Sequence, residues 1–410
     1  MVNESVTIIG GGPVGLTVAE ILSHNDISVQ VFEKNDAPSK EWRASTFHAG
    51  TLELLEETGV TEELLPKGIQ ADKVQYRDRQ NGLYAEFDFN LLKDETKYPF
   101  RLQCPQSTYV QTLYNRLKDK PNVDIHFQSE FKGMEQTENE VIVTLETPKG
   151  TKKFRSSYLL GADGASSKVR KALNMKFEGY TLEERFLLVG TPVPFDHYLS
   201  DISYVNYIAD PEEFLFILKV PEAWRLLYPI SSDTSEEEAL KEENIQKSLQ
   251  KALKTDDTFP IVEKMIYRVH QRVAESFYNH RTVLLGDAAH VNSPMGGLGL
   301  NNGIHDAVDL SKRLVRLLKE GSNDREEELK TYNNVRKKVA IDYIRQISER
   351  NTKVMKEKDE IRRLELQQEV TEEANNPEKA KKWLLRSAMI ASVREQGIGK
   401  IPETAEKTQN

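Results

Sequence analysis

A short β-branched run followed at once by a glycine-rich turn, near the start of the chain, constrains the fold more than any other feature. Residues 6–9 (VTII) are typical of a buried parallel strand, and Gly10, Gly12 and Gly15 follow it in a GxGxxG pattern. The next residues have the apolar spacing of a helix, and a second run, ISVQVFE, ends in Glu33. This order predicts a strand–turn–helix unit that binds a dinucleotide.

Each residue of the turn has an expected task. Gly10 permits the tight turn, Gly12 lets a pyrophosphate approach the backbone, and Gly15 lets the helix pack closely on the sheet. Pro13 and Val14 complete the GGGPVG segment at the helix N-terminus, where free N–H groups and the positive end of the helix dipole favour phosphate. We expect all five to line the cofactor site.

The end of the second predicted strand carries Glu33 and Lys34. A carboxylate at this position accepts hydrogen bonds from both hydroxyls of an adenosine ribose, and its charge disfavours a ribose with a 2′-phosphate. We expect both residues at the cofactor, which on this motif alone is either NAD or FAD.

The composition excludes several classes of protein. The 410 residues carry a formal net charge of −9, which disfavours nucleic acid as a partner. The single cysteine, Cys104, allows no intrachain disulfide and no cysteine-rich metal site, and we expect it to pack in the core. The chain begins without a signal peptide pattern, and no apolar stretch reaches 18 residues. We therefore expect a cytoplasmic protein without metal or membrane contact, either a monomer or a homodimer.

A second motif, YLLGADGASSKVRKAL, joins another short apolar strand to a helix. Its Asp163 either contacts the cofactor or serves only as a helix cap, and the residues leave both readings open.

The third motif, RTVLLGDAAHVNSPMGGLGLNNG, places Asp287 directly after a strand, where it can accept a hydrogen bond from a ribityl hydroxyl. The glycines leave room for a flat ring beside bare backbone, and the following helix N-terminus stabilises the negative charge of a reduced flavin. We expect His290 to orient this loop. The cofactor contacts predicted here are Gly296, Gly297, Gly299, Leu300 and Asn301.

Together the three motifs resemble those of the FAD-dependent aromatic hydroxylases, the p-hydroxybenzoate-hydroxylase-like single-component monooxygenases. WRASTFHAGTLELLEETGV resembles the family segment that places an arginine, here Arg43, near FAD. CPQSTYVQTLYNRL resembles the segment whose glutamine, here Gln106, contacts FAD. The resemblance covers roughly residues 5–350. The segment SPMGGLG, residues 293–299, is called the flavin loop below. It departs from the family pattern at Ser293 and Leu298, which puts in doubt any side-chain role at position 298.

The resemblance implies a reaction. NADPH or NADH reduces FAD, O2 adds to the reduced ring, and the resulting flavin hydroperoxide hydroxylates an aromatic or heteroaromatic small molecule. Two alternatives stay open: the same chemistry on a larger antibiotic-, quinolone- or quinone-like substrate, or a flavoprotein that does not hydroxylate. A flavin halogenase is disfavoured because the three tryptophans, Trp42, Trp224 and Trp383, lie far apart in sequence.

Candidate substrate residues are fewer and weaker. His48 is the candidate catalytic base, because it follows Arg43 closely and its intrinsic pKa suits proton transfer. Pro294 is expected between flavin and substrate. Three aromatic residues on predicted strands are expected to line an aromatic pocket, although each could be plain core: Tyr207, Phe216 and Tyr228.

The predicted fold is α/β, with a Rossmann-like FAD-binding domain, an inserted mainly β substrate domain and a C-terminal helical region. The last residues, 402–410, are expected to form a loose tail. The predicted bounds are 1–75, 98–180 and 265–320 for the FAD domain, 76–97 and 181–264 for the substrate domain, and 321–410 for the helical region.

Overall fold

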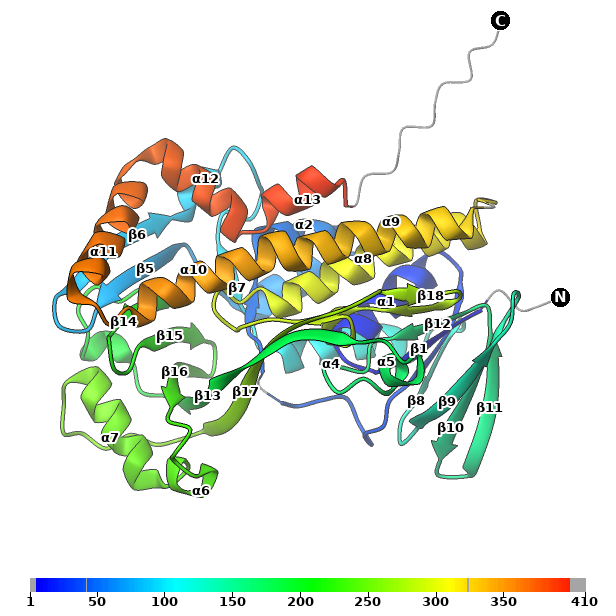
Figure 1. Cartoon of the computed structure of the whole chain (residues 1–410), viewed down its shortest axis with the longest axis horizontal. Coiled ribbons are helices and arrows are strands. Elements are labelled where there is room, and N and C mark those ends of the chain that lie inside the picture. Colours follow the sequence, from blue (N-terminus) through cyan, green and yellow to red (C-terminus); the bar gives the residue numbers. More distant parts are fainter. Residues whose placement is uncertain (1–4, 42, 323, 399–410) are drawn as a thin grey trace, which may run out of the picture.

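The computed structural model describes residues 5–41, 43–322 and 324–398. Trp42 and the expected tail at residues 402–410 lie outside these ranges. Figure 1 shows the parallel sheet with its helices, the large mixed sheet beside it, and a long helix that crosses both.

The nucleotide-binding part is built on a six-stranded sheet with the order β18-β19-β12-β1-β2-β8. Strand β1 pairs in parallel with β2 on one side and β12 on the other, and every residue of β1 is buried because helices cover the sheet. The strands are β1 (Ser5–Ile9), β2 (Ser28–Phe32), β8 (Val123–His126), β12 (Tyr158–Gly161), β18 (Tyr278–Asn279) and β19 (Thr282–Leu284).

Three helices surround the first turn of this sheet. Helix α1 packs against both α4 and α8, so segments far apart in sequence meet at one place. These helices are α1 (Pro13–His24), α4 (Gln106–Leu117) and α8 (Gly299–Leu318).

Two small antiparallel sheets extend this part. One is the meander β9 (Glu130–Gln136), β10 (Val141–Thr147) and β11 (Gly150–Ser156). The other has the order β3-β7-β4 and consists of β3 (Thr46–Phe47), β7 (Arg101–Gln103) and β4 (Ile69–Ala71). Short helices accompany them: α2 (Ala49–Glu56), α3 (Val60–Leu64), η1 (Leu65–Lys67), η2 (Phe89–Leu92) and α5 (Lys168–Ala172).

The large sheet has eight strands in the order β20-β17-β13-β16-β15-β14-β5-β6. Its end strand β20 directly follows Gly286 and Asp287 of the third motif, which form the turn called the GD turn below. The flavin loop is therefore attached to this sheet. The strands are β5 (Lys73–Asp78), β6 (Gly82–Asp88), β13 (Phe177–Thr191), β14 (Val205–Ala209), β15 (Leu215–Val220), β16 (Ala223–Ile230), β17 (Glu263–Ala274) and β20 (His290–Val291). The helical pieces η3 (Phe195–His197), α6 (Glu236–Ala239), α7 (Glu242–Leu253) and η4 (Gly286–Ala288) belong to the connections.

The C-terminal region is helical, as predicted. Helix α9 continues through a π-helical turn, η5, into α10, and this long rod crosses α8 and the large sheet in Figure 1. The elements are α9 (Arg325–Lys338), η5 (Val339–Ile344), α10 (Arg345–Lys356), α11 (Glu360–Asn375), α12 (Pro377–Ser387) and α13 (Ile390–Gln396). The architecture confirms the expected α/β class. Because β5, β13 and β17 all cross expected bounds, the exact division into domains stays a prediction.

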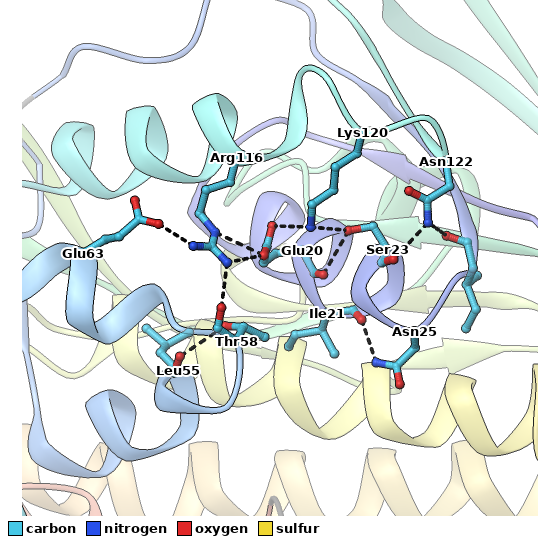
Figure 2. Close-up of polar contacts among 11 residues, drawn as sticks. Glu20, Ile21, Ser23, Asn25, Leu55, Thr58, Glu63, Arg116, Lys120 and Asn122 are labelled. Atoms are coloured by element: carbon cyan, nitrogen blue, oxygen red, sulfur yellow. Dashed lines mark hydrogen bonds and ion pairs between the residues drawn. The ribbon is translucent and has the colours of Figure 1, made fainter.

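A buried carboxylate joins α1 to α4 (Figure 2). Glu20 is 1% exposed, and its oxygens lie 2.8 Å from Arg116 Nη2 and 3.1 Å from Lys120 Nζ. Arg116 also pairs with Glu63 and donates to the carbonyl oxygen of Thr58 at 2.6 Å. This set, called the Glu20 cluster below, ties α1, α3 and α4 together on the side of the sheet.

Within residues 5–41, 43–322 and 324–398, no helix is long and apolar enough to cross a membrane. The same residues contain no group of three or more side chains placed to hold a metal ion.

Candidate active site

The first glycine turn is tight at two positions and open at a third. A Cβ atom on Gly10, whose φ is +111°, would lie 2.3 Å from the Ala162 carbonyl oxygen, and one on Gly15 would lie 2.1 Å from the Gly10 carbonyl oxygen. A Cβ on Gly12 would meet nothing within 4 Å. Gly12 also precedes α1 without a side-chain cap, and Pro13 opens the helix. The helix N-terminus therefore has the bare, accessible backbone that a pyrophosphate requires.

Glu33 lies at the end of β2, where two backbone amides hold its carboxylate. Gly11 N donates to Oε2 at 2.8 Å, and Asn35 N donates to Oε1 at 3.0 Å. Each oxygen keeps capacity for a further hydrogen bond, as recognition of a ribose diol requires. Lys34 is exposed and lines a surface hollow of about 570 Å³ together with Asn35 and Gln128.

Val14 brings the first and third motifs together. Gly286 has φ +57°, and a Cβ there would lie 2.9 Å from Val14 Cγ2. A Cβ on Gly303 of α8 would lie 2.7 Å from the same methyl group. The GD turn and α8 can approach α1 this closely only because both positions are glycine.

The second motif is joined to the third by an arginine. Asp163 accepts hydrogen bonds from Ser167 Oγ at 2.5 Å and Lys168 N at 2.7 Å, so it caps α5. Arg170 donates to the Ala288 carbonyl oxygen at 2.7 Å. The capping role considered for Asp163 is thus present, and its contact with the cofactor stays a prediction.

Asp287, in the turn that follows β19, is exposed to solvent. Its side chain keeps solvent access while protein closely surrounds it, and this desolvation raises its pKa. Arg43 is near enough for its charge to oppose the rise. Gln106 N donates to the Ala44 carbonyl oxygen at 2.8 Å, which places Gln106 beside the Arg43 segment. The structure therefore brings these three predicted contacts into one region.

Two glycines of the flavin loop are required by backbone conformation as well as by space. Gly296 and Gly297 have φ +115° and +68°, and a Cβ on Gly297 would lie 3.0 Å from Thr46 Cβ. Gly297 N donates to the Pro294 carbonyl oxygen at 2.9 Å, which closes a turn, and Gly299 begins α8. These glycines are therefore required by the backbone of the loop itself, and their contact with a flavin ring stays a prediction.

Asn301 fastens this loop to β3. Its Oδ1 accepts from His48 N at 2.9 Å, and its Nδ2 donates to the carbonyl oxygens of Thr46 at 2.8 Å and Gly297 at 2.7 Å. Leu300 beside it is buried. The side chain of Asn301 thus holds the loop, and the role of the Leu300 and Asn301 amides toward flavin stays a prediction.

His48 is fully buried and has one bonded and one free ring nitrogen. Nε2 lies 2.9 Å from the Gly296 carbonyl oxygen, which only accepts, so Nε2 carries the proton. Nδ1 then has an acceptor lone pair, and it finds no partner among the described residues. Burial, together with the charge of Arg101, lowers the pKa of His48 well below its usual value, so the imidazole is neutral at pH 7.

Two of the three predicted aromatic residues lie together near this histidine. Tyr207 stacks on Tyr76 with ring centres 5.0 Å apart and lies 4.9 Å from the Phe216 ring. Tyr76 donates to Asn351 Oδ1 at 3.2 Å, and a Cβ on Gly296 would lie 3.6 Å from Asn351 Nδ2. The aromatic group therefore adjoins the flavin loop.

Tyr228 does not join this group. It packs in a second hydrophobic core with Leu226 and with Ile245 and Leu249 of α7, separate from the core that contains Tyr207 and Phe216. That core covers the opposite side of the large sheet.

A buried network that the sequence motifs did not predict lies behind the flavin loop. Asp306 Oδ2 accepts from Gly286 N at 2.9 Å and lies 2.6 Å from His290 Nε2, while Oδ1 lies 2.7 Å from Arg336 Nε. Burial by itself would raise the pKa of Asp306, but His290 and Arg336 lower it to about 2. The network, called the Asp306 cluster below, bears out the orienting role expected of His290. The available signal was an acid, Asp306, directly before the apolar residues Ala307 and Val308.

Comparison with known proteins identifies the family. A profile of the family described as "FAD binding domain" matches residues 3–347. The chain is 31% identical over 370 residues to para-nitrophenol 4-monooxygenase of Pseudomonas sp. (strain WBC-3), covering 88% of this chain and 89% of that protein. It is 29% identical over 326 residues to 6-hydroxy-3-succinoylpyridine 3-monooxygenase HspB of Pseudomonas putida (strain DSM 28022 / S16), covering 78% and 81%. The crystal structure of p-nitrophenol 4-monooxygenase PnpA from Pseudomonas putida DLL-E4 superposes with a TM-score of 0.90 at 27% identity, covering 97% of this chain and 100% of that one.

The residues present fit FAD. The open backbone at Gly12 suits its pyrophosphate, the amide-held Glu33 suits its adenosine ribose, and the accessible carboxylate of Asp287 suits its ribityl chain. The chain therefore belongs to the FAD binding domain family and, like the relatives above, is an FAD-dependent aromatic hydroxylase, a monooxygenase that uses NAD(P)H and O2.

Proposed function

We propose that this enzyme hydroxylates a single-ring phenol that carries an electron-withdrawing substituent. The observation that carries the proposal is the match over nearly the full length of both chains to para-nitrophenol 4-monooxygenase, at 31% identity. The TM-score of 0.90 to a second p-nitrophenol 4-monooxygenase supports it. A group of stacked aromatic side chains that includes Tyr76 and Tyr207 adjoins the flavin loop, and such a group suits contact with an aromatic ring.

Bound FAD supplies the transfer of electrons from NAD(P)H to O2 and the activated oxygen atom. The chain supplies position and dryness. Asn301 and the Gly296 carbonyl hold His48 against the flavin loop, and the buried rings of Tyr207 and Phe216 keep water from the region beside it. Pro294, in the same loop, is proposed to line the space between cofactor and substrate.

His48 is the proposed acceptor of the phenol proton. Its Nδ1 lone pair is free while Nε2 is occupied by the Gly296 carbonyl oxygen. Removing this proton leaves a phenolate, which is more electron-rich on the ring than the phenol and so reacts faster with an electrophilic oxygen. A neutral buried imidazole is the protonation state that this step requires.

The test is oxidation of NADPH and of NADH in air by the FAD-loaded protein, with and without a panel of nitrophenols, halophenols and hydroxybenzoates. We expect one subset of acidic phenols to stimulate oxidation and to yield either a product heavier by one oxygen atom or, where the attacked carbon carries the nitro group or halogen, a quinone with release of nitrite or halide. Absence of stimulation by every phenol would contradict the proposal. The same assay decides between NADPH and NADH.

A His48→Asn variant tests the proton acceptor. For a weakly acidic phenol at pH 7, we expect kcat to fall by about 100-fold, the lower range for loss of a general base. For a phenol that is already ionised at that pH, kcat is expected to fall much less, because no proton has to be removed. Equal losses for both phenols would contradict the role of His48. His197→Asn, at an exposed histidine of η3, is the matched control.

The proposal also includes a cellular location and an oligomeric state. We propose a cytoplasmic location, supported by the lone buried Cys104, and a monomer or homodimer. Light scattering on a sizing column measures the second directly.

A further inference from the structure

Arg101 of β7 is a buried cation without an anion. Its residue is 2% exposed, its Nε has no hydrogen-bond partner, and among the described residues no carboxylate forms an ion pair with it. The guanidinium lies over the Phe89 ring, whose centre is 5.6 Å from Cζ. A charge removed from water without a partner is strongly unfavourable, so such a residue indicates a site for an anion.

Two further polar atoms close to Arg101 are buried and have no hydrogen-bond partner among the described residues. They are His48 Nδ1 and Gln103 Nε2. Gln103 lies two residues from Arg101 on the same strand, so both side chains lie on one face of β7. The Gln103 Oε1 accepts from Thr46 Oγ1 at 3.0 Å, which orients its unused Nε2–H groups. Unpaired buried groups are rare in folded proteins, and a cluster of them indicates a ligand.

Electrostatic coupling and contacts place this cluster at the flavin loop. Burial and the positive charge of Arg101 both lower the pKa of His48. At Tyr76, burial raises the pKa, and the charge of Arg101 opposes part of that rise. His48 is bonded to Gly296, and Tyr76 is bonded to Asn351, which itself adjoins Gly296. Arg101 is therefore close enough to act on His48, which the flavin loop holds, and on Tyr76 of the aromatic group.

We propose that Arg101, with Gln103, binds the anionic oxygen of the ring substrate, so that the site selects phenolates over uncharged ring compounds. This inference rests on the proposed function. The phenol O–H bond breaks, the proton goes to His48 Nδ1, and the electron pair stays on the oxygen that Arg101 holds. Arginine suits the task because its charge is permanent and its planar group presents several donors.

The test uses the FAD-loaded enzyme without NAD(P)H, with 4-nitrophenol as the probe. Its phenolate absorbs visible light, so difference spectra between about pH 6 and pH 9 report both affinity and the ionisation of the bound probe. We expect the wild type to bind the phenolate and to lower the pKa of the bound probe. Arg101→Met is expected to weaken phenolate binding by about 10- to 100-fold, as for a lost hydrogen bond to a charged group, and to return the probe's ionisation toward its free value.

Two matched variants accompany it. Arg101→Lys keeps the charge but not the fork of donors, so its affinity is expected between those of wild type and Arg101→Met. Arg155→Met removes an arginine of β11 whose side chain is 65% exposed, and its spectra are expected to match the wild type. Wild-type affinity and ionisation in Arg101→Met would overturn the inference.

A comparison of probes needs no variant and holds even if Arg101→Met loses FAD. We expect the wild type to bind 4-nitrophenolate at least about tenfold more tightly than the uncharged methyl ether, 4-nitroanisole. Equal affinity would overturn the inference. Failure of the proposed function looks different, because then no phenol yields a hydroxylated product even where the phenolate binds through Arg101.

Discussion

Glu20 and Asp306 are both carboxylates with almost no exposed surface, and each pairs with an arginine from another helix. The arginines differ in their access to water. The Arg116 side chain is 23% exposed, whereas Arg336 is fully buried. Burial of the acid alone therefore does not determine how much stability is lost when an ion pair is broken. What decides it is whether the partner can find water, or another acid, when the carboxylate is removed.

The two clusters also hold different things. Arg116 reaches on to Glu63 and the Thr58 carbonyl, which are near the surface (Figure 2). Asp306 instead binds the Gly286 amide and His290, the two ends of the GD turn. The Glu20 cluster therefore joins helices to one another, while the Asp306 cluster shapes the segment that leads into the flavin loop.

The largest effect is expected from Asp306→Asn. The variant leaves Arg336 buried without its counter-charge, and breaking a buried pair in this way costs about 3–5 kcal/mol of unfolding free energy. FAD affinity is expected to fall as well, because the amide cannot accept from Gly286, His290 and Arg336 as the carboxylate does. Denaturant unfolding and FAD content after gel filtration measure the two effects.

Glu20→Gln, the same type of change at the other cluster, is the control for Asp306→Asn. A loss of stability without any loss of FAD in Asp306→Asn would show that the cluster supports the fold but not the loop.

The next effect concerns His305, which adjoins the Asp306 cluster and bonds to Thr51 Oγ1 at 2.9 Å. Burial and the charge of Arg336 lower the pKa of His305 to about 3. As the pH falls below about 6.5, the unfolded chain takes up a proton here and the folded chain does not, so stability falls by at most about 1.4 kcal/mol per pH unit.

His305→Gln is expected to remove this contribution, so its stability declines less than that of the wild type between about pH 6.5 and pH 5, by about 2 kcal/mol. Unfolding curves at the two pH values provide the measurement, with His197→Gln as the exposed control. Identical pH dependence in His305→Gln and wild type would show that this region tolerates a second positive charge.

The parts of the site that the sequence predicted are those whose geometry is local. Gly10, Gly12 and Gly15 serve a turn formed by their own neighbours, so their spacing is sufficient. The same holds for Glu33, which closes the adjoining strand. A fold of this class could be inferred because three such local units occur in order.

The parts that escaped prediction depend on distant partners. Asp306 and Arg336 lie on different helices, and nothing in either helix indicates that they meet. Arg101 lies in a three-residue strand whose neighbours come from elsewhere in the chain. Period-two alternation could not show that Tyr228 faces away from Tyr207, because alternation orders the faces of one strand without saying which face turns inward.

A smaller effect is expected from Glu20→Gln itself. Arg116 keeps Glu63 and the Thr58 carbonyl, and Lys120 can extend toward solvent. We expect a loss of about 1–2 kcal/mol in unfolding free energy, between the values for exposed and buried pairs. FAD content is expected to match the wild type. A loss as large as that of Asp306→Asn would break the distinction between the clusters.

The smallest effect is the response of each pair to salt. Double-mutant cycles on Glu20 with Arg116 and on Asp306 with Arg336 isolate the two coupling energies. At about 1 M salt the screening length shrinks to about 3 Å, and ions reach the partly exposed Arg116 but not Arg336. We therefore expect the Glu20 coupling to fall by a few tenths of a kcal/mol between low and high salt, and the Asp306 coupling to stay constant. If both couplings fall alike, ions or water reach Arg336 as well. The difference between the clusters would then lie in what they hold, and no longer in what surrounds them.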